Sequence, residues 1–253
     1  MSEYVENDKT KSEAEARRDF ATSAVTATSL MQHAAFDQQQ GYAYNADEIS
    51  ENTYNTIIGA VILYGFVVTA LIAFLVPLEI TASYYPVVVI GYFICVAVGM
   101  AMCRKSENPK IDFIGYNLIV VPMAVVIGPA LAAVGFATVR YAFFVMALVA
   151  LLMVGLSKLY PQVFLSMGRL LFASLGIGLL TEVIMWCFSL SSGIFDFVFI
   201  AIFCGYIGYD WAVAQKRPKT VDAAIDSACM IYVDLINLLI RIIRIMASSK
   251  NKN

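Results

Sequence analysis

Long runs of apolar residues, separated by short polar connections, occupy most of the chain after residue 56. Each run is close to the ~20 residues that an α-helix needs to cross a hydrocarbon core of about 30 Å. Seven such runs are found, at residues 57–76, 85–102, 113–134, 141–156, 167–188, 195–214 and 223–245. The pattern therefore predicts an all-α, polytopic membrane protein with seven transmembrane helices.

Composition excludes a soluble fold. Hydrophobic residues make up 60% of the chain and charged residues 14%, whereas soluble domains have about 45–50% and about 25%. No basic patch with interleaved aromatic residues is present, so nucleic-acid binding is not expected. The five cysteines lack the paired spacing of zinc ligands, and neither a structural zinc site nor a disulfide framework is expected.

Charge divides the chain into three parts. Residues 1–55 hold ten acidic and four basic side chains, and we expect this acidic segment to be a largely disordered cytoplasmic tail without a cleavable export signal. Residues 56–246 form the predicted membrane domain, and 247–253 a short basic tail.

Basic residues in the connections predict the orientation. Residues 103–112 and 215–222 carry three Lys or Arg each, while 77–84 and 189–194 carry none. The first two connections should face the cytoplasm, which places the amino terminus inside. Seven crossings would put the four basic residues of 241–253 outside, against this bias. The last segment therefore either crosses the membrane or re-enters.

Acidic side chains inside membrane spans need an explanation, because each costs on the order of 2.5–3.5 kcal/mol at a helix centre. Asp196 lies at the edge of the sixth span, where we expect it to be solvated and structural. Glu182 is deep in the fifth span and needs a partner from another helix, or a proton. Two further candidates stand out, Asp210 and Asp234.

Asp210 and Asp234 form the most informative pair. A short loop joins their helices, which are expected to be antiparallel neighbours. At the helical rise the two acids lie about 7 and 10 Å from the same membrane boundary, so they can meet. Gly205 and Gly208 remove side-chain bulk before Asp210 and would let another backbone approach closely.

The last predicted helix has one polar face, formed by Ser227, Asp234, Asn237 and Arg241. A polar face at membrane depth must meet protein or a water-filled cavity, which predicts a central position for this helix. The face either holds the bundle together through hydrogen bonds or marks an ion or proton path. We favour the path, because paired intramembrane acids usually have that role.

Two carboxyl groups in contact share a proton, and their titration belongs to the pair. The single histidine, His33, lies in the tail, so pH sensing within the membrane would depend on these carboxyl groups. A deprotonated pair offers hard oxygen ligands suited to Ca²⁺, with Asn237, Tyr206 or Tyr209 as helpers. We expect Ca²⁺ as a transported ion and no resident cofactor.

Arg104 ends the second predicted helix, and its long side chain could reach towards the acid pair as a counter-ion latch. It could equally be an ordinary basic residue that sets orientation.

Three segments carry a resemblance to a known family. Residues 205–210 read Gly-Tyr-Ile-Gly-Tyr-Asp, residues 232–238 read Tyr-Val-Asp-Leu-Ile-Asn-Leu, and residues 240–245 read Ile-Arg-Ile-Ile-Arg-Ile. Together they resemble the Bax inhibitor-1 family. Met-Gly-Arg-Leu-Leu-Phe at 167–172 is similar to its bacterial branch.

The resemblance implies seven helices, with two layers of three enclosing the last. It also implies a pH-sensitive Ca²⁺ leak in which Asp210 and Asp234 match the family's paired aspartates and Arg104 its latch arginine. Glu182 departs from the family, which has an apolar or neutral residue there. A bacterial inner or plasma membrane is the expected location, with lipid, Ca²⁺ and H⁺ as partners.

Other functions stay open. Tyr209-Asp210 and Pro-Ala-Leu at 129–131 superficially resemble intramembrane aspartyl proteases, but Pro-Ala-Leu precedes both acids and the second acid lacks its Gly-x-Gly-Asp context. We therefore do not expect an enzyme. A non-conducting regulator of membrane proteins or proteases and a proton-coupled exchanger are further alternatives.

Overall fold

The computed structural model describes residues 48–75, 85–187 and 194–250. Most of the predicted acidic tail and residues 251–253 lie outside this part of the chain. The described helices belong to one compact unit that begins at Ile49. They are α2 (Glu51–Leu75), α4 (Tyr85–Lys105), α5 (Pro109–Val134), α6 (Phe136–Leu159), α7 (Pro161–Ser166), α8 (Gly168–Cys187), α9 (Ile194–Lys216) and α10 (Val221–Lys250).

The described part of the chain is all-helical, as predicted, and a long helix covers most of each predicted apolar run. Among the described residues, four helical segments are long and apolar enough to cross a membrane by length and composition, namely Glu51–Ala73, Pro109–Gly128, Phe136–Leu159 and Ile194–Lys216. Ile90–Cys103 and Gly168–Gly178 are shorter apolar segments. The layout with seven crossings stays a prediction.

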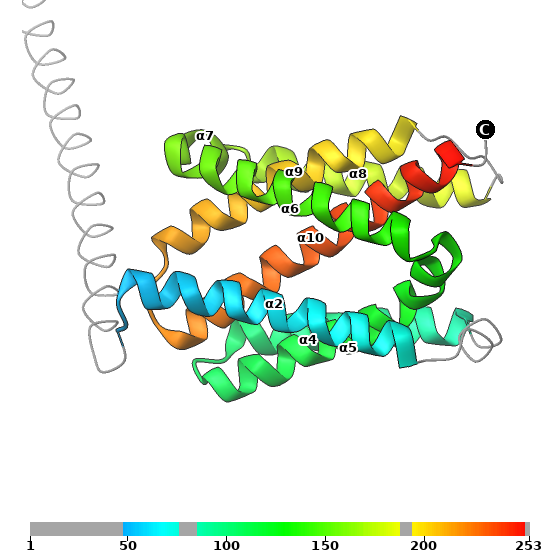
Figure 1. Ribbon diagram of the computed structural model, residues 1–253. Helices are drawn as coiled ribbons and strands as arrows, with labels where there is room; N and C mark the ends of the chain where they lie inside the picture. The colour runs from blue at the N-terminus through cyan, green and yellow to red at the C-terminus, as the bar shows by residue number, and fades with distance from the viewer. Residues whose placement is uncertain (1–47, 76–84, 188–193, 251–253) are drawn as a thin grey trace, which may run out of the picture. The chain divides into compact units, whose positions relative to one another are not determined.

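The long helices form two groups with α10 between them (Figure 1). In one group α5 packs against both α2 and α4, and in the other α9 packs against α6, α7 and α8. α10 contacts members of both groups, and its side chains from 223 to 243 are mostly buried. It runs unbroken over 30 residues, so this segment does not turn back on itself as a re-entrant one would.

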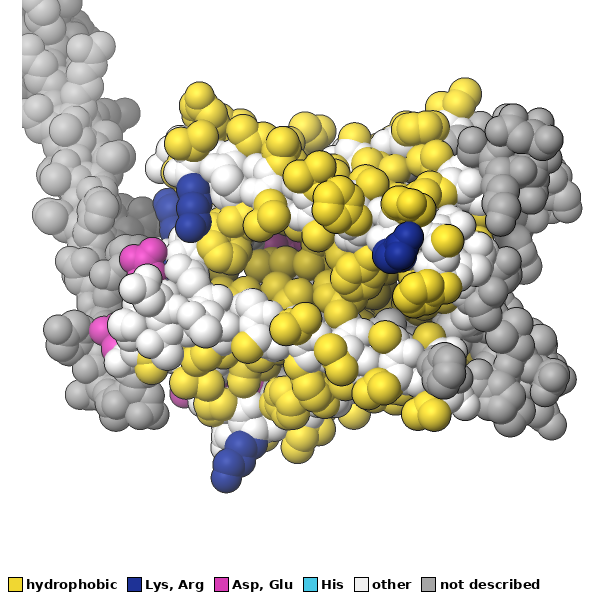
Figure 2. Space-filling view, viewed as in Figure 1, with side chains coloured by type: hydrophobic (Ala, Val, Ile, Leu, Met, Phe, Trp, Pro, Cys, Tyr) yellow, Lys and Arg dark blue, Asp and Glu magenta, His cyan; other side chains and the backbone are white. Residues whose placement is uncertain are grey.

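The outward-facing surface is apolar. Large hydrophobic side chains are exposed on α2, α6 and α8, including Leu63, Leu151 and Phe172. Figure 2 shows hydrophobic side chains over most of the visible face, with charged groups at a few places. Such a surface would be unfavourable in water and matches a hydrocarbon environment. The chain is therefore an integral membrane protein.

Close packing joins α4 to α5, and side-chain contacts of Tyr232 join α10 to α5 and α2. Gly99 and Gly115 let α4 and α5 approach through their backbones, because a Cβ added at Gly99 would lie 2.5 Å from the Gly115 carbonyl oxygen. The buried Tyr232 of α10 packs edge-on against Tyr116 of α5, and its hydroxyl lies 2.6 Å from Thr69 Oγ1 of α2. α10 is thus anchored to this group of helices near the depth of Asp234.

Candidate functional site

The two acids singled out in the sequence lie together in the structure. Asp210 of α9 is half-buried and Asp234 of α10 is 7% exposed. A hydrogen bond joins their side chains. Because an ionised carboxylate can only accept, such a bond forms only when one of the two carboxyl groups is protonated. Within the described residues Asp234 Oδ2 is buried without a hydrogen-bond partner.

Both acids line a cavity of about 600 Å³. α9 and α10 contribute its polar wall, while Met100 of α4 and Phe172 and Leu175 of α8 contribute apolar side chains. The volume is in the range of small-ligand sites in proteins. The polar side chains of the lining therefore belong mainly to α9 and α10.

Three of the predicted supporting residues line the same cavity, namely Tyr206, Tyr209 and Asn237. Asn237 Nδ2 donates to the carbonyl oxygen of Val233 one turn earlier, at 2.8 Å. Neutral oxygen atoms thus accompany the carboxyl pair. Within the described residues no group of three or more His, Cys, Asp or Glu side chains could hold a metal ion. The roles of these residues in pH sensing and Ca²⁺ binding stay predictions.

Arg241 lies elsewhere. Its Nη1 is 3.1 Å from Asp196 Oδ1, and its guanidinium carbon is 4.0 Å from the centre of the Phe199 ring. Arg244 reaches the same oxygen at 3.4 Å. Because α9 and α10 are antiparallel, the far end of α10 faces the start of α9. The expectation that Asp196 is solvated is wrong, since this residue is 7% exposed and ion-paired.

The expectation for Gly205 and Gly208 also needs correction. Their missing side chains make room for side chains of the neighbouring helices and not for a backbone. A Cβ at Gly205 would lie 2.7 Å from Leu171 Cδ2, and one at Gly208 would collide with the Phe164 ring. The two glycines therefore allow side chains of α7 and α8 to pack closely against α9. This packing was invisible in the sequence because the partners are far away in the chain.

Two predicted residues have side chains that the structure leaves undescribed. Arg104 belongs to α4 and Glu182 to α8. The latch role of Arg104 and the need of Glu182 for a partner stay predictions.

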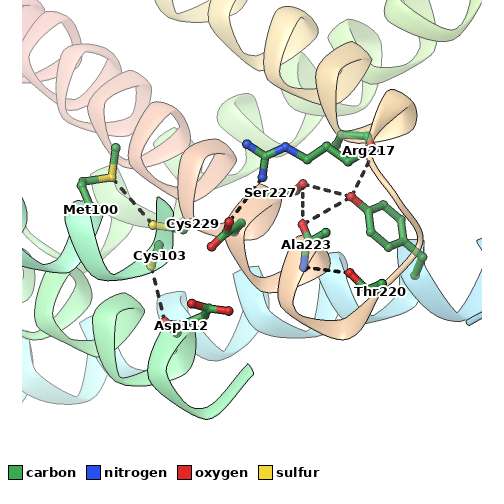
Figure 3. Close-up of polar contacts among 11 residues, drawn as sticks. Met100, Cys103, Asp112, Arg217, Thr220, Ala223, Ser227 and Cys229 are labelled. Carbon is green, nitrogen blue, oxygen red and sulfur yellow. Dashed lines mark hydrogen bonds and ion pairs between the residues drawn. The ribbon is translucent and has the colours of Figure 1, made fainter. Parts of the chain in front are cut away.

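Sequence reasoning missed the part that Arg217 plays. As one of the three basic residues in 215–222, it was used only to predict the orientation of the chain in the membrane. In the structure it lines the cavity together with Asp210 and Asp234. Its Nη1 lies 3.6 Å from Asp226 Oδ2 in the first part of α10. Figure 3 shows its side chain extending over the segment that carries Ser227. The only available signal was its position directly after α9, six residues before the acid-bearing helix was predicted to begin.

Comparison with known families gives a match over most of the chain. The family model Bax1-I, described as "Inhibitor of apoptosis-promoting Bax1", matches residues 47–251, a range that includes all the described helices. No curated protein matches the chain.

Proposed function

The chain belongs to the Bax inhibitor-1 family, and on this premise we propose that it is a passive, pH-regulated leak for Ca²⁺ or other cations. The observation that carries the proposal is the hydrogen-bonded pair of Asp210 and Asp234, with the unpartnered Asp234 Oδ2, at one wall of a cavity. Charged groups at membrane depth are costly and are retained mainly where they serve transport.

A proton and a cation would compete for the same oxygens. When the pair holds a proton, the hydrogen bond keeps the two side chains together and one negative charge is neutralised. When the proton leaves, two like charges face each other and offer hard oxygen ligands, which Ca²⁺ prefers. Tyr206, Tyr209 and Asn237 would replace part of the ion's hydration shell. Arg104 would serve as a counter-ion latch.

The proposed setting is a membrane crossed by seven helices, with α10 in the centre. The basic connections after α4 and α9 face the cytoplasm, as does the amino terminus. A bacterial inner or plasma membrane suits this orientation and the sequence at 167–172. Lipid, H⁺ and Ca²⁺ are then the partners of the chain, with no enzymatic activity.

The test is Ca²⁺ flux in proteoliposomes from mildly acidic to mildly alkaline pH. The parent should conduct in a pH-dependent way, whereas Asp210→Asn and Asp234→Asn should lose flux or its pH dependence. Asp222→Asn is the matched control, because Asp222 is also on α10 but does not line the cavity. Unchanged pH-dependent flux in both pair variants would refute the proposal.

A second candidate is a non-conducting regulator that binds other membrane proteins. The family description supports it, because it names inhibition of another protein. An aspartyl protease or a proton-coupled exchanger would use the same acid pair. Cleavage of a helical reporter that requires both acids would favour the protease over a leak. Electroneutral ion uptake against a gradient that requires both acids would favour the exchanger.

A further inference from the structure

Tyr54 connects three helices at the end of the bundle that carries the α9–α10 turn. Its side chain is fully buried near the start of α2. The hydroxyl oxygen lies 3.0 Å from the Ala214 carbonyl oxygen of α9, 3.0 Å from Ser227 Oγ and 3.3 Å from the Ala223 carbonyl oxygen of α10. Ser227 itself donates to the Ala223 oxygen at 2.7 Å. One hydroxyl therefore bridges α9 and α10 from a third helix.

The Tyr54 hydroxyl supplies a hydrogen bond to a carbonyl group at the carboxyl end of α9. The last carbonyl groups of a helix have no partner within it, which is costly away from water. Lys219 Nζ donates to the carbonyl oxygens of Ala214 at 3.3 Å and Gln215 at 2.8 Å, and Tyr54 supplies the third side-chain contact here. Lys219 Nζ also lies 4.4 Å from the centre of the Tyr54 ring. The end of α9 is thus capped jointly by the turn and by α2.

Further contacts tie the start of α2 to the same turn. The Ile49 backbone N–H donates to the Lys219 carbonyl oxygen at 2.8 Å, and Gln215 Nε2 donates to Asn55 Oδ1 at 2.9 Å. Ile49 and the first turns of α2 therefore lie directly against the α9–α10 turn.

The same atoms border the cavity of the acid pair. Ala214 and Ser227 both line it, Ala214 four residues after Asp210 and Ser227 seven residues before Asp234. These spacings correspond to about one and two helical turns. Figure 3 shows Ser227, Ala223 and Arg217 grouped at this end. Any separation of α9 from α10 at Tyr54 would widen the cavity there.

We propose that Tyr54 is a positioning residue for the leak, whose hydroxyl holds α9, α10 and α2 together and keeps the turn end of the cavity narrow. This inference rests on the proposed function. Without the hydroxyl, the α9–α10 turn opens more often and cations pass more readily, while the acid pair keeps its pH response.

The test compares Tyr54→Phe with the parent in the full chain. Phe keeps the ring and its contact with Lys219 but removes the bridge. Tyr64→Phe is the matched control, because it also removes a phenol hydroxyl from α2, one that donates to Asn117 Oδ1 at 2.8 Å on an exposed face. Amide hydrogen exchange of residues 214–228 and Ca²⁺ flux in proteoliposomes are measured for each variant.

In Tyr54→Phe, exchange over 214–228 should become about fivefold faster, the effect of losing one typical hydrogen bond from a local opening. Flux should rise severalfold at every pH, and Tyr64→Phe should match the parent in both measurements. Ser227→Ala, which removes one of the three partners of the Tyr54 hydroxyl, should shift both measurements in the same direction but less.

The two hypotheses fail in different ways. Unchanged exchange in Tyr54→Phe overturns the bridge whatever the flux, and faster exchange with parental flux overturns its positioning role. Failure of the proposed function appears instead as normal pH-dependent flux in Asp210→Asn and Asp234→Asn. Exchange does not depend on conduction, so it reports on Tyr54 even in the Asp234→Asn background.

Discussion

Arg241 of α10 places its Nη1 3.1 Å from Asp196 Oδ1 at the start of α9, across 45 residues of sequence. Both side chains are about nine-tenths buried, and Arg241 also covers the Phe199 ring. Arg244 approaches the same carboxylate oxygen at 3.4 Å but is half-exposed. The α9–α10 interface is therefore joined by charge at one end and by the Tyr54 bridge at the other.

Removing Asp196 should destabilise the protein strongly. Asp196→Ala removes the carboxylate that the buried Arg241 guanidinium contacts at 3.1 Å, and breaking a buried ion pair typically costs about 3–5 kcal/mol. Arg244→Ala should cost less than about 1 kcal/mol, because its exposed pairing is screened. Thermal unfolding in detergent measures both. Equal losses for the two variants would mean that Arg241 is not held by Asp196.

Gly208→Ala should lower stability by about 1–3 kcal/mol, because the new methyl group must displace the Phe164 ring in a packed contact. Gly59→Ala is the control, since nothing lies within 4 Å of a Cβ added there. Its helix should gain up to about 1 kcal/mol from alanine's higher propensity. Unfolding midpoints of the two variants should move in opposite directions, and a tolerated Gly208→Ala would contradict the packing of α7 on α9.

Lys219 should make stability depend on pH in the alkaline range. Burial lowers the pKa of its amine from the ordinary 10.5, with Glu51 opposing this in part. Between the lowered value and 10.5 the unfolded chain binds more protons than the folded one, so this residue's contribution to stability rises with pH. Below that window the cost of burying the charge is fully present.

The comparison is Lys219→Met, which cannot titrate. The unfolding midpoint of the parent, minus that of Lys219→Met, should increase as pH rises towards 10.5. A difference that stays constant or falls would show that the amine keeps its ordinary pKa in the folded protein.

Deleting residues 1–46 should leave the leak and its pH dependence in place. The retained chain includes Ile49, which binds the α9–α10 turn, and all the helices that line the cavity. Proteoliposome flux of the shortened and full chains tests this expectation. If the full chain does not conduct but binds a membrane protein, and the shortened chain loses this binding, the result would instead support the non-conducting regulator.

The sequence by itself determined the helical, membrane-embedded character of the protein, because long apolar runs are a local property that needs no partner to be recognised. It also brought Asp210 and Asp234 to similar depths on consecutive helices, since a short turn and the helical rise leave little freedom in their relative height. The family follows from the same local segments and from the match over residues 47–251.

Only the tertiary structure decided which side chains meet across the bundle. Asp196 could not be assigned to Arg241, nor Phe164 to Gly208, because each contact depends on the rotation and crossing of helices about their axes, which apolar runs on all sides do not specify. Tyr54 fell within the acidic segment 1–55 that we expected to be largely disordered, whereas in the structure it belongs to α2. Its burial against the α9–α10 turn follows from how α2 packs. The acid pair could be predicted because Asp210 and Asp234 are on consecutive helices joined by a short turn. The contacts that hold these helices in place join segments that are distant in the sequence.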